Sequence, residues 1–255
     1  MTISERIHRA NAVVECEKLM SCHVYYHAAG IHREEIEEFW SKRDDVTWAH
    51  NFGQMGNRAN YIKNYADNQE KNTREVFEAV AKVYPEVLDK EKVPDYRAIC
   101  EEAMHFTVSP VIEVAEDGQS AKGLWYTPGF IYSTLNPQQA REGTWIWERY
   151  GVDFIYEDGR WVILNLKVCC DISGEMDAPD WPIAPRPQMP APPGDGEAPP
   201  PPIGGMDVTY PGPLHYELSS TQVPQERPFI PVPYRTFSET CSYATLTGIY
   251  EERDK

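Results

Sequence analysis

Two stretches of sequence decide the fold: HFTVSPVIEVAEDGQSAKGLWYTPGFIY at 105–132 and GTWIWERYGVDFIYEDGRWVILNLKVCC at 143–170. Both are rich in β-branched and aromatic residues, which favour strands. Each is divided by an Asp-Gly pair, at 117–118 and 158–159, and such a pair between two strand-like segments is a strong signal of a hairpin. The two stretches therefore predict four antiparallel strands that run as a meander.

The sequence before this meander is mainly helical, because its apolar residues recur at helical spacing. The expected elements are helices at 4–29, 32–41, 60–83 and 96–103 and one strand at 44–53. On the first helix, the spacing predicts an inward stripe of Leu19, Cys22 and Tyr26. Helices followed by a curled antiparallel sheet predict the α+β class.

The sequence after the meander differs in composition. We expect one packed domain at 1–172, a proline-rich acidic connector at 173–205 and an extended irregular C-terminal arm at 206–255. The arm is rich in tyrosine, phenylalanine and isoleucine, which are too apolar for a free linker. We expect it to dock on a neighbouring subunit and hold a homo-oligomer, a dimer or trimer; docking on its own domain is the alternative.

Composition excludes several classes of function. The formal net charge is −16, and no basic stripe is present, so we expect no nucleic-acid partner. No apolar stretch is long enough to cross a bilayer, which predicts no membrane partner and a cytoplasmic protein. His23 and His27 are four residues apart and His32 follows, but the HExxH pattern is missing. We expect no metal and no organic cofactor.

Four segments carry a resemblance to a known family: VYYHAAGIHREEIEEFW at 24–40, DDVTWAHNFG at 44–53, MHFTVSPVIEVAEDGQSAKG at 104–123 and WERYGVDFIYEDGRWVI at 147–163. Together they resemble the SnoaL-like group of the nuclear-transport-factor-like superfamily, which includes scytalone dehydratase, bile-acid dehydratase and steroid isomerases. The resemblance covers about Ala10 to Ile172 and implies a cone-shaped sheet. The C-terminal arm is similar to an extension of some members, including lyases that act on lignin-derived aromatics.

The resemblance implies catalytic residues. Dehydratases of this group use a histidine in the strand after the helices, helped by a tyrosine and an aspartate of the first helix region. His105 matches the histidine and Tyr26 the tyrosine, but Gly30-Ile31-His32 stands where relatives place the aspartate. His32 or Glu148 is the expected replacement.

The residues themselves support this assignment. Imidazole has an unperturbed pKa near working pH, so a histidine at position 105 is suited to moving protons, although a core histidine is the alternative. The Tyr26 hydroxyl can polarise a substrate oxygen, unless this ring is only core. We expect His50 as a second acid-base group or a surface histidine, and Glu148 as a pocket carboxylate unless it pairs with Arg149. The expected substrate-binding residues are Tyr150, Trp48, His32, Trp125 and Trp147.

The resulting hypothesis is a cofactor-independent lyase. It performs dehydratase-type elimination by acid-base catalysis on a hydrophobic aromatic or polycyclic hydroxylated substrate. Formaldehyde release from a lignin-derived diarylpropane-like diol and double-bond isomerisation are alternatives that use the same groups. The competing class is a non-catalytic ligand-binding or assembly module of the same fold. His105 and Tyr26 pointing into one cavity would favour the enzyme.

Overall fold

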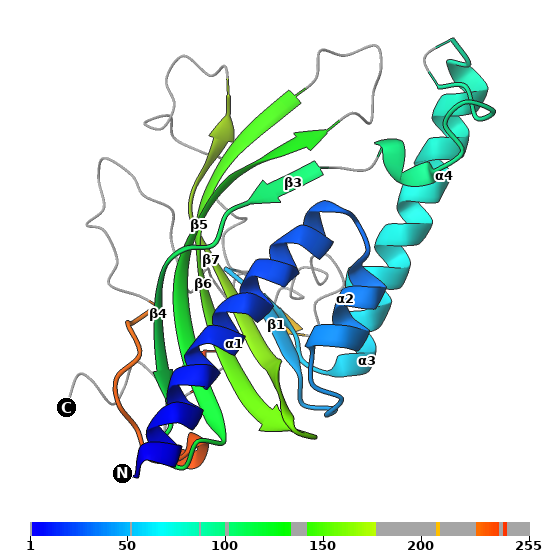
Figure 1. Ribbon diagram of the computed structural model, residues 1–255. Coiled ribbons are helices and arrows are strands. Elements are labelled where there is room, and N and C mark those ends of the chain that lie inside the picture. Colours follow the sequence, from blue (N-terminus) through cyan, green and yellow to red (C-terminus); the bar gives the residue numbers. More distant parts are fainter. Residues whose placement is uncertain are drawn as a thin grey trace, which may run out of the picture.

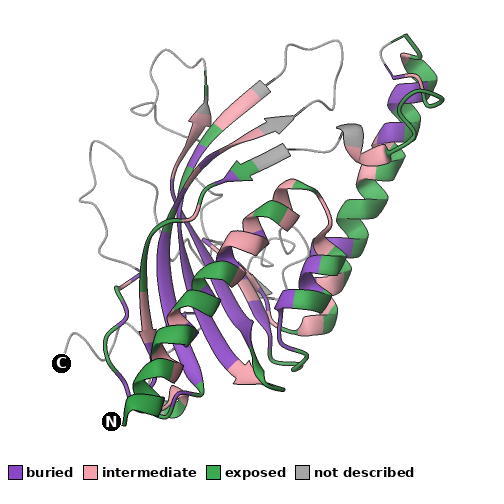
Figure 2. Ribbon diagram, viewed as in Figure 1, coloured by how far each residue is buried: buried purple, intermediate pink, exposed green. Residues whose placement is uncertain are grey.

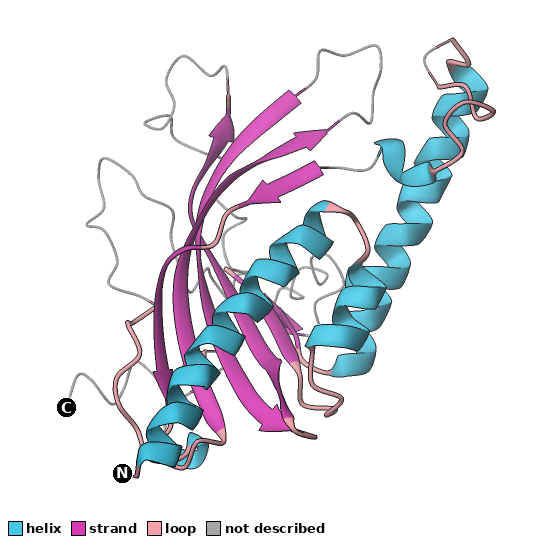
Figure 3. Ribbon diagram, viewed as in Figure 1, coloured by secondary structure: helices cyan, strands magenta, loops and turns pink. Residues whose placement is uncertain are grey.

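The computed structural model describes residues 2–51, 53–86, 88–99, 102–133, 142–176, 208–209, 228–239 and 242–243. Helices lie over the concave side of a strongly bent sheet (Figure 1, Figure 3). The helices are α1 (Ile3–Ala28), α2 (His32–Phe39), α3 (Arg58–Tyr61), a π-helical segment (Ile62–Asp67), α4 (Asn68–Val83) and 3-10 turns at Tyr96–Ile99 and Phe237–Glu239. The strands are β1 (Thr47–His50), β2 (Gly53–Met55), β3 (Glu102–His105), β4 (Val108–Val114), β5 (Ser120–Ser133), β6 (Glu142–Glu157), β7 (Arg160–Glu175) and β8 (Val208–Thr209).

The predicted meander is confirmed, and so is the α+β class. Strands β4, β5, β6 and β7 pair with their sequence neighbours in antiparallel fashion. The Asp-Gly turns place Gly118 and Gly159 at φ 68° and 80°, a left-handed conformation that glycine adopts without strain. One pairing departs from the prediction, since β1 joins β7 in parallel. The sheet is therefore mixed, with one parallel pair inside it.

Helix α1 buries a different stripe from the one predicted. Its fully buried residues include Cys16, Met20 and His23, whereas the predicted Leu19, Cys22 and Tyr26 are only half-buried. Successive residues are about 100° apart on a helix, so a shift of one position exchanges the residues that face the sheet. The histidines of α1 consequently face inward in place of Tyr26.

The segment around His105 also differs from the prediction. The expected helix at 96–103 is reduced to the 3-10 turn, and Glu102–His105 instead pair with β5. The expected continuous strand from His105 is interrupted between β3 and β4, although Phe106 still donates its N–H to the Pro128 carbonyl at 3.0 Å. The register against β5 shifts only further on, between Val108 and Val111. His105 therefore ends a short strand.

The core lies between α1, α2 and the concave face of the sheet, where buried residues concentrate (Figure 2). The largest fully buried apolar side chains are Trp40, Trp125, Tyr61, Phe154, Met20, Ile36, Ile163, Leu164 and Leu166. Polar residues interrupt this apolar face where α1 ends, next to β1, β3 and the middle of β6. This is where the candidate site lies.

The convex face carries a buried ion pair that the C-terminal arm contacts. Lys122 Nζ lies 2.7 Å from an Asp153 oxygen, with side-chain exposures of 5% and 0%. The second oxygen of Asp153 accepts the backbone N–H of Tyr243 at 3.1 Å. The hydroxyl groups of Tyr234 and Ser120 lie 3.1 Å apart. The described part of the arm thus packs on the sheet of its own chain.

The connector at 173–205 lies outside the described residues from 177 onward, as does most of the arm at 206–255. The expected dimer or trimer stays a prediction. In the described part of the chain, no helix has the length and apolarity needed to cross a membrane.

Candidate active site

Five of the seven histidines gather at the C-terminal end of α1. His27 lies in the middle, with its ring centroid 5.9 Å from that of His23, 5.1 Å from His32 and 5.5 Å from His105. His50 joins from β1 through a shared carboxylate. His23, His27 and His32 lie within ten residues of one another on α1 and α2. The fold adds His50 and His105, which are distant in sequence, from β1 and β3.

The first of two buried carboxylates in this cluster is Glu35 of α2. One of its oxygens lies 2.7 Å from His23 Nδ1 and accepts the Trp40 indole N–H at 3.0 Å. The other oxygen faces His32 Nδ1 at 3.8 Å. Burial alone would raise the pKa of Glu35, but the neighbouring imidazoles, first His23 and then His32 and His27, outweigh burial and hold this pKa well below its usual range. Glu35 is therefore ionised.

The second carboxylate is Glu148 of β6. Its Oε2 lies 3.4 Å from His105 Nδ1 and its Oε1 lies 4.0 Å from His50 Nε2. The side chains of Glu148 and His105 are only 8% and 5% exposed. An irregularity in the β6–β7 register lies between Trp147 and Glu148, and such bulges redirect side chains. Glu148 is thus a carboxylate held between two imidazoles.

Two phenols complete the cluster. The Tyr65 hydroxyl lies 2.7 Å from His27 Nδ1, and the Tyr150 ring centroid lies 6.1 Å from that of His105. Burial, followed by nearby carboxylates, raises the pKa of both phenols well above the usual range, so they stay protonated. Desolvation and then the neighbouring imidazoles hold the pKa of His27 well below its usual range. His27 is consequently a neutral ring.

Most of the predicted site residues lie in or beside this cluster: His105, His50, Glu148, Tyr150, Trp48 and His32. Three do not. Tyr26 donates its hydroxyl to Glu38 at 3.0 Å on the outer side of α1, because the buried stripe is shifted. Trp125 is packed against Phe154 in the core, and Trp147 points to the opposite face of the sheet with 47% exposure.

Four residues of the cluster were not among the predicted site residues: His23, His27, Tyr65 and Glu35. The spacing of four residues between His23 and His27 was the available signal for His27. Tyr65 lies on the π-helical segment, which a regular helical period does not describe. Glu35 sits among exposed acidic residues in the sequence, and nothing local marks it as buried.

A cleft of about 310 Å³ borders the cluster. It is lined by Gly30, Ile31, His32, Arg33, Glu34, Ala66, Glu70, Arg74, Tyr96 and Arg97. Each of these arginines has a carboxylate partner nearby, so the cleft carries no strong net charge. His32 belongs to both the cleft and the cluster and therefore links them.

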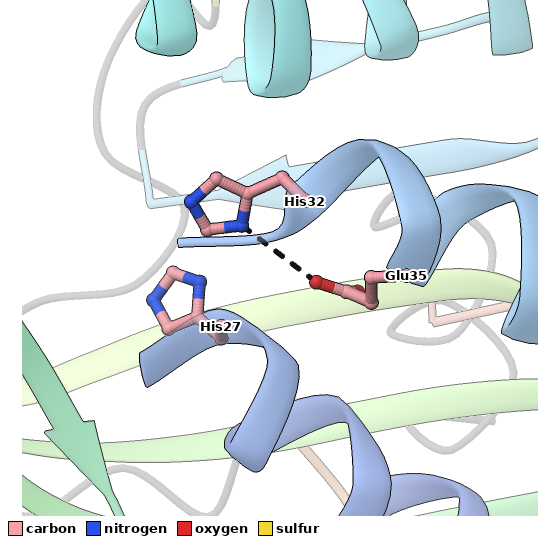
Figure 4. Close-up of side chains that lie close together, drawn as sticks. All are labelled: His27, His32 and Glu35. Carbon is pink, nitrogen blue, oxygen red and sulfur yellow. Dashed lines mark ion pairs between the residues drawn. The ribbon is translucent and has the colours of Figure 1, made fainter. Parts of the chain in front are cut away.

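Among the described residues, one group also has the composition of a metal site. His27, His32 and Glu35 each offer a ligand atom, and these atoms lie within 4.8 Å of one another (Figure 4). Two are histidines from the weak metal pattern in the sequence. Its third member, His23, bonds the Glu35 carboxylate instead.

The fold and this inward-facing polar cluster define a cone-type α+β protein with a site in the concavity of its sheet. The family model of the SnoaL-like domain matches residues 8–167, well over half of the chain. The chain belongs to the SnoaL-like family.

Several solved structures are similar to this chain. A protein described as a putative scytalone dehydratase from Novosphingobium aromaticivorans DSM 12444 is 12% identical, with a TM-score of 0.45 over 68% of this chain and 93% of its own. A hexachlorocyclohexane dehydrochlorinase (LinA) type 2 is 14% identical, with a TM-score of 0.45 over 67% and 93%. No curated protein matches significantly. These likenesses assign neither a reaction nor a substrate to this chain.

Proposed function

We propose that this protein is a lyase that eliminates water from a hydrophobic hydroxylated substrate by acid-base catalysis, without a cofactor. The observation that carries the proposal is the buried pair of His105 and Glu148, whose facing atoms are 3.4 Å apart. A histidine oriented by a buried carboxylate can take a proton from carbon, because the carboxylate stabilises the imidazolium that forms. His50 on the other oxygen of Glu148 supplies a second group of this kind.

The elimination balances with these groups alone. His105 Nε2 takes the proton from carbon while the Glu148 carboxylate, 3.4 Å from Nδ1, stabilises the imidazolium that forms. The electron pair of the C–H bond forms the new double bond as the C–O bond on the adjacent carbon breaks. The departing hydroxide takes the proton back from His105 and leaves as water. The Tyr150 hydroxyl, protonated in this environment, can donate to the departing oxygen.

The apolar and aromatic surroundings favour an aromatic or polycyclic substrate. Trp48 stacks near His50, with ring centroids 6.0 Å apart, and also lies 5.9 Å from the Tyr65 ring. Such rings bind flat apolar groups, and a conjugated substrate also spreads the negative charge that develops on its carbon. Formaldehyde loss from a diarylpropane-like diol and double-bond isomerisation use the same base and remain alternative outcomes of the test.

The test is turnover of a panel of hydroxylated diaryl and polycyclic phenols, with loss of water or formaldehyde followed by mass spectrometry. His105→Gln is expected to lower the rate about 10²–10⁴-fold with an unchanged circular dichroism spectrum. His8→Gln is the matched control, since His8 lies near the far end of α1 and contacts the Gly118 carbonyl. Equal turnover by both folded variants would refute the assignment. Ligand binding without turnover would favour the non-catalytic module.

A further inference from the structure

We propose that His27, His32 and Glu35 form a binding site for a divalent transition-metal ion, best suited to Zn²⁺. The three side chains flank the turn at Gly30: His27 is in the last turn of α1, and His32 and Glu35 are in the first turn of α2. Two imidazoles and one carboxylate are a common ligand set for such ions. The proposed elimination needs no metal, so this inference goes beyond it.

The geometry is close to that of a bound ion. The ligand atoms lie within 4.8 Å of one another, and His32 Nδ1 is 3.8 Å from Glu35 Oε2. A tetrahedral ion with bonds of about 2.0–2.2 Å holds its ligands roughly 3.5 Å apart. Small rotations of the side chains therefore close the site around an ion. Figure 4 shows the Glu35 carboxylate directed at the His32 ring, with the His27 ring alongside.

Two of the ligand atoms have no hydrogen-bond partner among the described residues. Glu35 is fully buried, yet its Oε2 has no hydrogen-bond partner there, and neither does His32 Nδ1. A buried carboxylate oxygen without a partner is costly, because it has lost its water and gained no bond. A cation between these atoms would satisfy both. A simple ion pair at 3.8 Å does so only poorly.

The surrounding residues hold the ligands as outer-shell partners do in metal proteins. Glu35 Oε1 is fixed by His23 and Trp40, which leaves Oε2 to face the site. His27 Nδ1 contacts the Tyr65 hydroxyl at 2.7 Å. When Nδ1 donates to that hydroxyl, Nε2 carries the lone pair that a metal requires. This pattern, a ligand histidine held through its other nitrogen, orients rings in metal centres.

The test uses the full chain, freed of metal with a chelator and titrated with Zn²⁺ by calorimetry and with Co²⁺ by visible absorption. We expect one equivalent bound, with the absorption bands of Co²⁺ in a site containing histidine nitrogen. His32→Ala is expected to weaken binding more than the roughly 10–100-fold that loss of an outer-shell partner costs, and Tyr65→Phe to weaken it within that range. His8→Ala, on the same helix but at its other end, is expected to bind as the unmodified protein does.

Failure to bind Zn²⁺, or binding by folded His32→Ala equal to that of His8→Ala, would overturn the proposal. If His32→Ala does not fold, His32→Asn provides the same comparison with a polar side chain retained. The result is separable from the lyase proposal, because metal titration does not involve His105. Turnover of the chelated protein tests that proposal alone.

Discussion

Replacing Asp153 with alanine is expected to destabilise the protein by about 3–5 kcal/mol, because it breaks a buried ion pair. The Asp153 side chain is fully buried, and Lys122 Nζ contacts it at 2.7 Å. Asp153 also accepts hydrogen bonds from Asn165 at 3.1 Å and from the backbone of Tyr243 at 3.1 Å. The substitution therefore leaves a buried ammonium group without this carboxylate and removes an anchor of the C-terminal arm.

The assay is equilibrium unfolding in urea, combined with limited proteolysis of the arm. Asp45→Ala is the control, since Asp45 pairs with Arg43 on the surface, with side-chain exposures of 59% and 51%. Exposed pairs contribute about 1 kcal/mol or less. The Asp153→Ala variant should also be cut faster in the arm. A loss of stability no larger than that of Asp45→Ala, with an equally protected arm, would refute this account of the convex face.

Three further predictions follow from buried or closely packed positions. Burial lowers the pKa of Lys167 to about 8 from its ordinary 10.5, so the charged form destabilises the fold. Stability is expected to rise between pH 8 and 10.5 by about 3 kcal/mol, and urea unfolding of Lys167→Met should lack this rise. Gly129→Ala places a Cβ 2.1 Å from the Met104 carbonyl, so it should displace β3 with His105, and lower both turnover and melting temperature. Tyr26→Phe should change turnover less than about twofold, whereas Tyr150→Phe should lower it at least about tenfold in the same assay.

The sequence predicts the elements better than it predicts their faces. The meander follows from alternating apolar residues and two Asp-Gly turns, and both signals are local. The side of α1 that faces the sheet differs from the predicted one, because apolar residues such as Leu19 and Val24 occur all around the helix. The buried side also includes the polar His23. A helix with little amphipathic contrast does not show which side meets the sheet.

The site is less predictable for a different physical reason. Glu148 reaches His105 and His50 because the bent sheet brings β3 and β1, each separated from β6 by one strand, toward it, and because the β6–β7 register shifts beside it. Neither the meeting of strands nor a bulge is visible in a period-2 pattern. The resemblance to a family supplied His105, and the alternation of β6 placed Glu148 and Tyr150 on one face. The pairing of His27 with Tyr65 depends on the π-helical segment and had no local signal.

The two proposed sites have the same electrostatic arrangement. Each buried carboxylate faces two imidazoles: Glu35 faces His23 and His32, and Glu148 faces His50 and His105. A buried negative charge is stable only with a compensating positive charge. Each carboxylate therefore favours one positive charge beside it, either a proton on an imidazole or a bound cation. In the lyase proposal, the proton that His105 takes from the substrate supplies that charge beside Glu148. Around Glu35, the His27 and His32 rings offer ligand atoms beside the carboxylate, so a metal ion can supply it. Because each carboxylate has its own pair of imidazoles, either function can be removed by substitution while the other is measured.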